Sequence, residues 1–194
     1  TIKKLSRTNK IWLCVVSEGT SSQYSDKKMI KVRSDACKKS AKILGISKIQ
    51  FLDYPDMRLD LVPHLEINKQ LEKIIKKFKP SIVYSPPSHD LNKDHQKVFE
   101  SALVITRPFS SSVKKLLCYE LPGPVREPFH PSVYENIEKE FSHKIKAFKM
   151  YKTEVMKFPH PRSIKAIENL AIQRGVESSL KMAESFQLIR SIEE

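Results

Sequence analysis

Residues 81–95 read SIVYSPP, SHDLNK and DH, and this stretch decides the fold. The apolar run over 81–87 predicts a short buried strand that ends at its two prolines. The polar residues over 88–93 predict a loop, and we expect a helix to begin close to Asp94. Because open α/β sheets bind their ligands at the carboxyl ends of their strands, Asp94 and His95 are expected where such a fold does its chemistry.

Strands and helices alternate over the first two thirds of the chain. Apolar runs predict strands over 10–17, 49–52, 82–85 and 115–121, and amphipathic periodicity predicts helices over 26–44, 63–78 and 94–105. After a proline-rich loop over 122–131, helices are expected at 134–150, 163–174 and 177–186. This order predicts a Rossmann-like α/β fold of three layers, α/β/α, with a mostly parallel sheet and a helical C-terminal part.

The composition bounds the class of protein. The chain has 194 residues, 40% of them hydrophobic and 29% charged, which is ordinary for a single globular domain over 1–194. No apolar run approaches the roughly 20 residues of a membrane span, and no signal-peptide pattern is visible. Cys14, Cys37 and Cys118 lack metal-type spacing, so we expect reduced thiols and a cytoplasmic protein.

The formal net charge of +13 raises the question of an acidic partner. The lysines are spread over the polar faces of nearly every predicted helix, without an arginine-rich run or interleaved aromatics. This pattern favours a solvated surface over a nucleic-acid site, and the remaining alternative is an anionic substrate rather than DNA. The four glycines all lie at ends of predicted elements, so neither a phosphate-binding loop nor a dinucleotide fingerprint is expected.

Further motifs follow one another along the chain. They are Thr1–Leu5, Val15–Thr20, Arg33 with Asp35, Leu44-Gly45, Pro55-Asp56, Asp90–His95, Tyr119-Glu120, Lys144 with Ala147 and Tyr151, Pro159–Ser163, Arg174-Gly175 and Ala183–Phe186. No single motif is specific, but their order and spacing together are. By them the chain resembles the LmbE-like, or PIG-L, family of zinc-dependent N-acetylglucosaminyl de-N-acetylases along almost its whole length.

The resemblance implies a zinc site of which this sequence holds one part. The family's first metal motif, His-Pro-Asp-Asp, carries two zinc ligands and the general base, and it would lie immediately before Thr1. The chain is therefore expected to be a fragment that lacks the first strand and the metal-binding loop. By the same resemblance His95 is the third ligand of Zn²⁺, since catalytic zinc sites use three protein ligands and leave one position for water. The alternative for His95 is a histidine that caps or packs near a helix start.

Two residues beside His95 are candidates for catalysis. Asp94 could hold a neighbouring group by a hydrogen bond or act as a helix cap, and both alternatives stay open. Asn92 stands where many family members have His; an amide can donate a hydrogen bond to an oxyanion but cannot act as a general acid. His89 could supply the acid, although an exposed loop histidine is the plainer interpretation.

Substrate contacts are expected from three residues elsewhere. The family places a substrate-contacting arginine near Arg33, whose fork suits a carboxylate, a phosphate or a pair of hydroxyls. A solvated surface arginine is the alternative. His160 and Arg162 lie in a loop held by prolines, and such loops often carry sites. A role of Ser163 as the N-cap of the next helix would explain part of that pattern without a site.

The resemblance implies a function for the intact protein. It would be a zinc-dependent hydrolase that removes the acetyl group from an N-acetylated amino sugar or sugar conjugate. The protein could form a homo-oligomer. Zinc would polarise the amide carbonyl and the missing Asp would take the proton. The fragment itself is expected to bind zinc poorly and to be inactive. The alternatives are a catalytically inactive sugar-binding module, in keeping with Asn92 and with Ser179 where the family often has Gly, and a basic nucleic-acid-binding domain. The sequence leaves the sugar and its carrier open.

Overall fold

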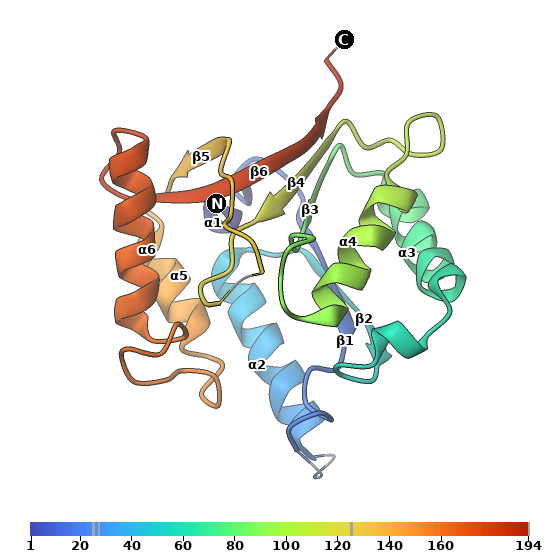
Figure 1. The fold of residues 1–194 in the computed structure, drawn as a ribbon, viewed down its shortest axis with the longest axis horizontal. Helices are drawn as coiled ribbons and strands as arrows, with labels where there is room; N and C mark the ends of the chain where they lie inside the picture. The colour runs from blue at the N-terminus through green and yellow to red at the C-terminus, as the bar shows by residue number, and fades with distance from the viewer. Residues whose placement is uncertain (25, 27, 125, 194) are drawn as a thin grey trace. The chain divides into compact units, whose positions relative to one another are not determined.

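The computed structural model describes residues 1–24, 26, 28–124 and 126–193 (Figure 1). Its helices are α1 (Ile2–Leu5), α2 (Lys28–Leu44), the 3-10 helix η1 (Leu59–Leu61), α3 (His64–Phe78), α4 (Lys93–Ile105), α5 (Phe141–Phe148) and α6 (Ile164–Glu177). Its strands are β1 (Trp12–Ser17), β2 (Lys48–Tyr54), β3 (Ile82–Ser85), β4 (Lys115–Tyr119), β5 (Val133–Asn136) and β6 (Ala183–Ser191). The predicted loops over 18–25 and 122–131 contain Ser25 and Val125, which lie outside the described residues. No helix among the described residues has both the length and the apolar character needed to cross a membrane.

The strands form two sheets. β1 pairs in parallel with β2, with Trp12 opposite Lys48 and Val15 opposite Phe51. The second sheet has the order β3-β4-β6-β5, in which β3 and β4 are parallel and β4 and β6 are antiparallel. The α/β class is confirmed, and the parallel pairs join strands linked by helices, as in a Rossmann-like fold. The prediction of one mostly parallel sheet is corrected in detail, because the second sheet is mixed.

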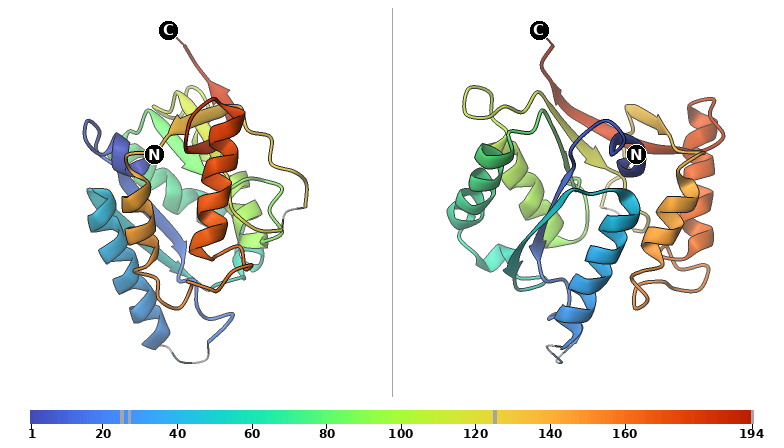
Figure 2. Two further views of the ribbon diagram at one scale, coloured as in Figure 1. Left: turned by 90° about the vertical axis from the view of Figure 1, so that its left-hand side faces the viewer. Right: turned by 180° about the vertical axis from the view of Figure 1, so that it is seen from behind.

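The chain divides into two compact units, each built from two stretches of sequence. Unit 1 comprises Thr1–Pro55 and Tyr134–Glu184, and unit 2 comprises Asp56–Val133 and Ser185–Glu194. In unit 1, α2 packs against α5, and both views of Figure 2 show α6 alongside α5. In unit 2, α4 packs against α3, η1 and β3 (Figure 1). That all 194 residues form one domain stays a prediction.

The predicted periodicity is confirmed in the long helices of the first half. The buried face of α2 includes Ala36, Cys37 and Ala41, and the helix is followed by Gly45 with a φ of +80°. This left-handed conformation is the usual way to end a helix, and glycine adopts it without a steric penalty. Helix α3 buries Ile67, Asn68, Leu71 and Ile75. The apolar residues spaced by three and four positions therefore form the core, as the sequence predicts.

Two predicted helices in the C-terminal third are wrong in part. The stretch predicted as one helix over 134–150 contains most of strand β5 and becomes helical only over α5. The stretch predicted as a helix over 177–186 runs into strand β6, which pairs with β4. Tyr119 lies opposite Phe186, and Leu117 lies opposite Leu188. Pairing with a distant strand therefore outweighs local helical propensity here.

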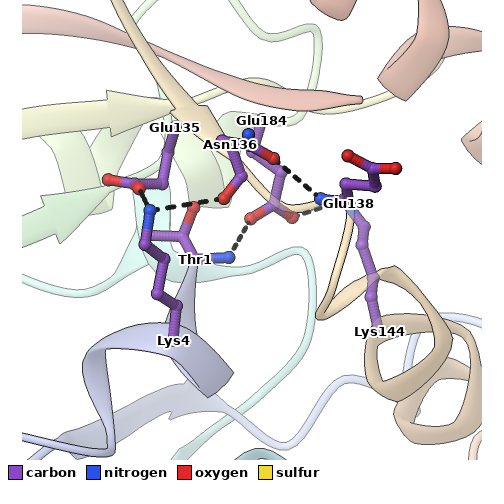
Figure 3. A network of polar contacts seen from close by, with 7 residues as sticks. All are labelled: Thr1, Lys4, Glu135, Asn136, Glu138, Lys144 and Glu184. Atoms are coloured by element: carbon purple, nitrogen blue, oxygen red, sulfur yellow. Dashed lines mark hydrogen bonds and ion pairs between the residues drawn. The ribbon is translucent and has the colours of Figure 1, made fainter. Parts of the chain in front are cut away.

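An ion-pair network joins α1, α5, β5 and the start of β6 in unit 1 (Figure 3). The Glu184 carboxylate accepts hydrogen bonds from the Thr1 ammonium at 2.6 Å and from Lys144 Nζ at 2.5 Å. Lys4 Nζ pairs with the carboxylate of Glu135. Burial alone would raise the pKa of Glu184, but the ammonium groups of Lys144 and Thr1 outweigh burial and hold that pKa at about 2. Glu184 is therefore ionised at every pH near neutrality.

The three cysteines are free thiols, as predicted. Burial raises the pKa of Cys14 and of Cys118 to about 12. Burial also raises the pKa of Cys37. Because the thiolate is the reactive form, these side chains are inert in the folded protein at neutral pH.

Candidate functional site

The loop after β3 and the first turn of α4 hold the central residues of the predicted site. Asn92 is the N-cap of α4, and its Oδ1 accepts the N–H groups of Asp94 at 2.8 Å and of His95 at 3.3 Å. Oδ1 of Asp90 accepts the N–H of Asn92 at 2.8 Å. Side chains that hydrogen-bond to the backbone a few residues on fix such a turn locally. Residues 90–95 thus form a rigid entry to the helix.

The imidazole of His95 is oriented by a carboxylate. Its Nδ1 lies 2.7 Å from Oδ2 of Asp90. Since an ionised carboxylate can only accept, Nδ1 is the donor of this hydrogen bond, and Nε2 is the ring nitrogen that Asp90 leaves unused. A histidine that binds a metal is commonly held by a carboxylate in this way. The sequence predicts no separate role for Asp90, and the signal that marks it is a carboxylate five positions before His95.

Asp94 stabilises the same turn by hydrogen bonds between its carboxylate and a neighbouring stretch of backbone. Its side chain is buried, with the residue 4% exposed. Oδ2 accepts the N–H of Met57 at 2.8 Å, and Oδ1 accepts the N–H of Leu59 at 3.0 Å. Both oxygens are therefore engaged by the backbone that leads into η1, and the N-cap is Asn92 rather than Asp94. A direct part of Asp94 in catalysis stays a prediction.

His89 differs from its prediction as an exposed loop residue. It is only 8% exposed, and its ring centroid lies 5.6 Å from that of Phe129. Its backbone oxygen accepts the N–H of Arg126 at 2.9 Å, and Nε2 is buried with no hydrogen-bond partner among the described residues. The aromatic contact explains the burial: His89 packs the proline-rich segment against the loop that leads into α4.

Unit 1 brings together the three residues predicted to contact substrate. Arg33 Nη2 donates to Oε1 of Glu154 at 2.6 Å, and Arg162 Nη1 donates to Oε2 of the same carboxylate. His160 Nδ1 accepts the N–H of Arg162 at 3.0 Å. The side chain of Arg33 is only 19% exposed, so the alternative of a solvated surface arginine is wrong. Ser163 also caps α6, by accepting the N–H of Ala166, as the alternative for this loop predicted.

The residues present fit one position of a metal site and do not complete it. His95, with Nδ1 bound to the Asp90 carboxylate, has the form of a single metal ligand that would bind through Nε2. Within 1–24, 26, 28–124 and 126–193, no three His, Cys, Asp or Glu side chains are grouped so that they could hold a metal ion. No reaction step is therefore derived through a metal from these residues.

Comparison with known proteins starts with sequence. The profile of the PIG-L family, described as GlcNAc-PI de-N-acetylase, matches residues 1–106, more than half of the 194 residues. The chain belongs to the PIG-L family. The PIG-L match includes Arg33 and residues 90–95, and it ends before His160 and Arg162. The resemblance stated from the motifs is thereby confirmed.

Solved structures share the PIG-L chain's fold at low sequence identity. N,N'-diacetylchitobiose deacetylase from Pyrococcus horikoshii has a TM-score of 0.79 at 20% identity, over 97% of this chain and 76% of that one. The conserved protein TT1542 from Thermus thermophilus has a TM-score of 0.80 at 19% identity, over 100% and 89%. GalB, the 4-carboxy-2-hydroxymuconate hydratase from Pseudomonas putida, has a TM-score of 0.78 at 17% identity, over 100% and 92%. Such likeness shows the fold, and the presence of a hydratase means that the fold alone does not determine the reaction.

Proposed function

We propose that this PIG-L protein is a metal-dependent hydrolase that removes the acetyl group from an N-acetylated amino sugar or sugar conjugate. The observation that carries the proposal is the Asp90–His95 pair at the start of α4, within the part of the chain that matches the family. A carboxylate-oriented histidine next to a helix N-cap at the end of a parallel strand is what a metal hydrolase of an α/β fold needs. The description of the family as a de-N-acetylase and the Pyrococcus deacetylase of similar fold support the reaction class.

Each residue of the motif has a proposed role. His95 would hold zinc through Nε2 while Asp90 fixes the ring and its tautomer. When bound, zinc supplies an activated water and a polarised carbonyl. Asn92 uses its Oδ1 as the helix cap, so its Nδ2 donors remain for the oxyanion that develops on the amide. Asp94 would keep the turn at the site in place, and the other ligands are expected in the segment that the resemblance puts before Thr1.

Acetate release from N-acetylglucosamine and its conjugates tests this proposal. The protein to assay contains residues 1–194 together with the sequence encoded immediately before Thr1. His95→Gln is expected to lower acetate release by about a thousandfold, because the metal loses a ligand. His64→Gln is the matched control, since His64 Nε2 bonds Ser101 Oγ at 3.0 Å between α3 and α4 of the same unit. Full activity of the His95 variant, or an equal loss in both variants, contradicts the proposal.

A sugar-binding module without catalysis is the second candidate. It is favoured by the absence of a three-ligand group among the described residues. The discriminating measurement is binding of N-acetylglucosamine by calorimetry, with and without a chelator. If the longer protein releases no acetate and binds N-acetylglucosamine equally well with and without the chelator, the result favours the sugar-binding module. For residues 1–194 alone we expect weak zinc binding and no hydrolysis, because a single histidine is not a zinc site.

A further inference from the structure

One face of α2 fixes the segment that follows α5. Arg33, Cys37 and Ser40 are spaced by four and three residues, so their side chains share one face of the helix. The side chain of Tyr151 makes hydrogen bonds with Cys37 and Ser40. The N–H of Glu154 donates to the carbonyl oxygen of Tyr151 at 2.8 Å. A short turn anchored on α2 thus delivers the carboxylate of Glu154 to Arg33.

The carboxylate of Glu154 lies between two guanidinium groups. Arg33 and Arg162 each donate to a different oxygen of it, and Thr153 Oγ1 lies 3.3 Å from Oε1. Glu154 is 8% exposed, whereas the side chain of Arg162 is 39% exposed. Two guanidinium groups thus bind one carboxylate, in the way that arginine forks also bind carboxylate or phosphate ligands.

The segment around Arg162 is fixed on both sides. Its N–H donates to Nδ1 of His160 at 3.0 Å, and its carbonyl oxygen accepts the N–H of Met156 at 3.2 Å. These two contacts fix the backbone of Arg162 beside Glu154. An incoming anion would have to approach a buried carboxylate of the same sign, which costs free energy in a partly desolvated place.

We infer that Glu154 is a built-in counter-ion that closes the Arg33–Arg162 pair to phosphate and carboxylate groups. The pair then offers its remaining N–H donors to uncharged hydroxyl or amide oxygens. The identity of the ligand as a sugar rests on the proposed function, whereas the exclusion of anions does not. The anionic substrate that the net charge left open is therefore not recognised by these two arginines.

Chemical rescue tests the inference. Glu154→Ala leaves a gap between two unpaired guanidinium groups, and acetate or inorganic phosphate should fill it. We expect the thermal unfolding midpoint of Glu154→Ala to fall in sodium chloride and to rise saturably with acetate or phosphate at constant ionic strength. The wild-type midpoint should not distinguish the three salts. Saturable stabilisation of the wild type by phosphate, or no rescue of a folded Glu154→Ala by either anion, overturns the inference.

A matched control separates this arrangement from ion pairing in general. Glu140 is similarly buried and accepts a hydrogen bond from a single arginine, Arg7, whose side chain is 59% exposed. Glu140→Ala should lose stability without saturable rescue, because one exposed guanidinium does not enclose an anion. Rescue of Glu140→Ala equal to that of Glu154→Ala contradicts a special role of the pair.

A second measurement covers the case in which Glu154→Ala does not fold. Phosphate is titrated into the wild-type protein while the Nε–Hε signals of Arg33 and Arg162 are followed by NMR. Unchanged signals support the closed pair, and saturable shifts of both signals overturn it. Because neither experiment needs acetate release, failure of the deacetylase proposal leaves the result interpretable.

Discussion

The start of α4 in unit 2 and the ion-pair networks around Glu154 and Glu184 in unit 1 hold their carboxylates in different ways. Both oxygens of Asp94 accept backbone N–H groups, which do not titrate. Glu154 and Glu184 are each held by two cations. Added salt screens ion pairs, whereas it has much less effect on hydrogen bonds from uncharged backbone N–H groups. The comparison teaches that the helix start carrying His95 is a fixed scaffold, while the integrity of unit 1 depends on charge.

The largest expected effect is that of Asp94→Ala. It leaves the N–H of Leu59, a buried residue, without its partner and removes two hydrogen bonds to a charged group. We expect the free energy of unfolding to fall by about 4 kcal/mol. Urea denaturation monitored by circular dichroism measures it. The control is Asp60→Ala in the exposed part of η1, which should stay within about 0.5 kcal/mol of wild type. A small loss for Asp94→Ala would break the comparison.

Lowering the pH should destabilise unit 1 by protonating Glu184. The pKa of Glu184 is about 2 in the folded protein against the ordinary 4.5 of a glutamate, so ionised Glu184 stabilises the fold above pH 4.5. This contribution, of the order of 3 kcal/mol, is lost as the pH falls from about 4.5 towards about 2. The free energy of unfolding of wild type and Glu184→Gln should therefore differ at pH 7 and converge in acid. Curves that stay parallel down to pH 2.5 (roughly the end of this range) would show that the two ammonium groups do not hold Glu184.

Replacement of the helix cap has a smaller effect and sharpens the role of Asn92. Asn92→Ala should lower the free energy of unfolding by about 1 kcal/mol, because two N–H groups lose their acceptor. Asn92→Asp keeps the cap and should be nearly as stable as wild type. It removes the Nδ2 donors, so acetate release by the longer protein should still fall. Equal activity of Asn92→Asp and wild type would assign Asn92 to capping alone.

Salt gives the smallest of the expected effects. In about 1 M sodium chloride the screening length drops to roughly 3 Å, so the destabilisation caused by Glu184→Gln should shrink by about 0.5 kcal/mol. The destabilisation caused by Asp94→Ala should not change, since its partners are uncharged N–H groups. Urea titrations of Glu184→Gln, Asp94→Ala and wild type in low and high salt measure both changes. The same salt response in both variants would remove the distinction between the two regions.

Local features of the fold and site could be predicted from the sequence. The strand over 82–85, the helix over 94–105 and the placement of His95 all depend on residues close together in the chain. The family resemblance likewise depends on ordered local motifs, and the profile match confirms it.

Contacts between distant residues could not be predicted. Glu154 meets Arg33 across 121 positions, and no local pattern marks a carboxylate for a partner so far away. The sequence predicts a helix over 177–186, which includes the first residues of β6, because its pairing partner β4 lies far back in the sequence. The burial of His89 depends on Phe129, which follows a further strand. In each case the deciding interaction is tertiary.

The buried thiols provide natural reporters of the separate opening of the two units. Cys14 and Cys37 belong to unit 1, and Cys118 belongs to unit 2. Cys37 and Cys118 are buried and Cys14 is partly buried, and burial raises the pKa of all three thiols, so alkylation at each is expected to speed up when its surroundings open. Mass spectrometry of the labelled peptides would therefore time the opening of each unit within one unmodified chain.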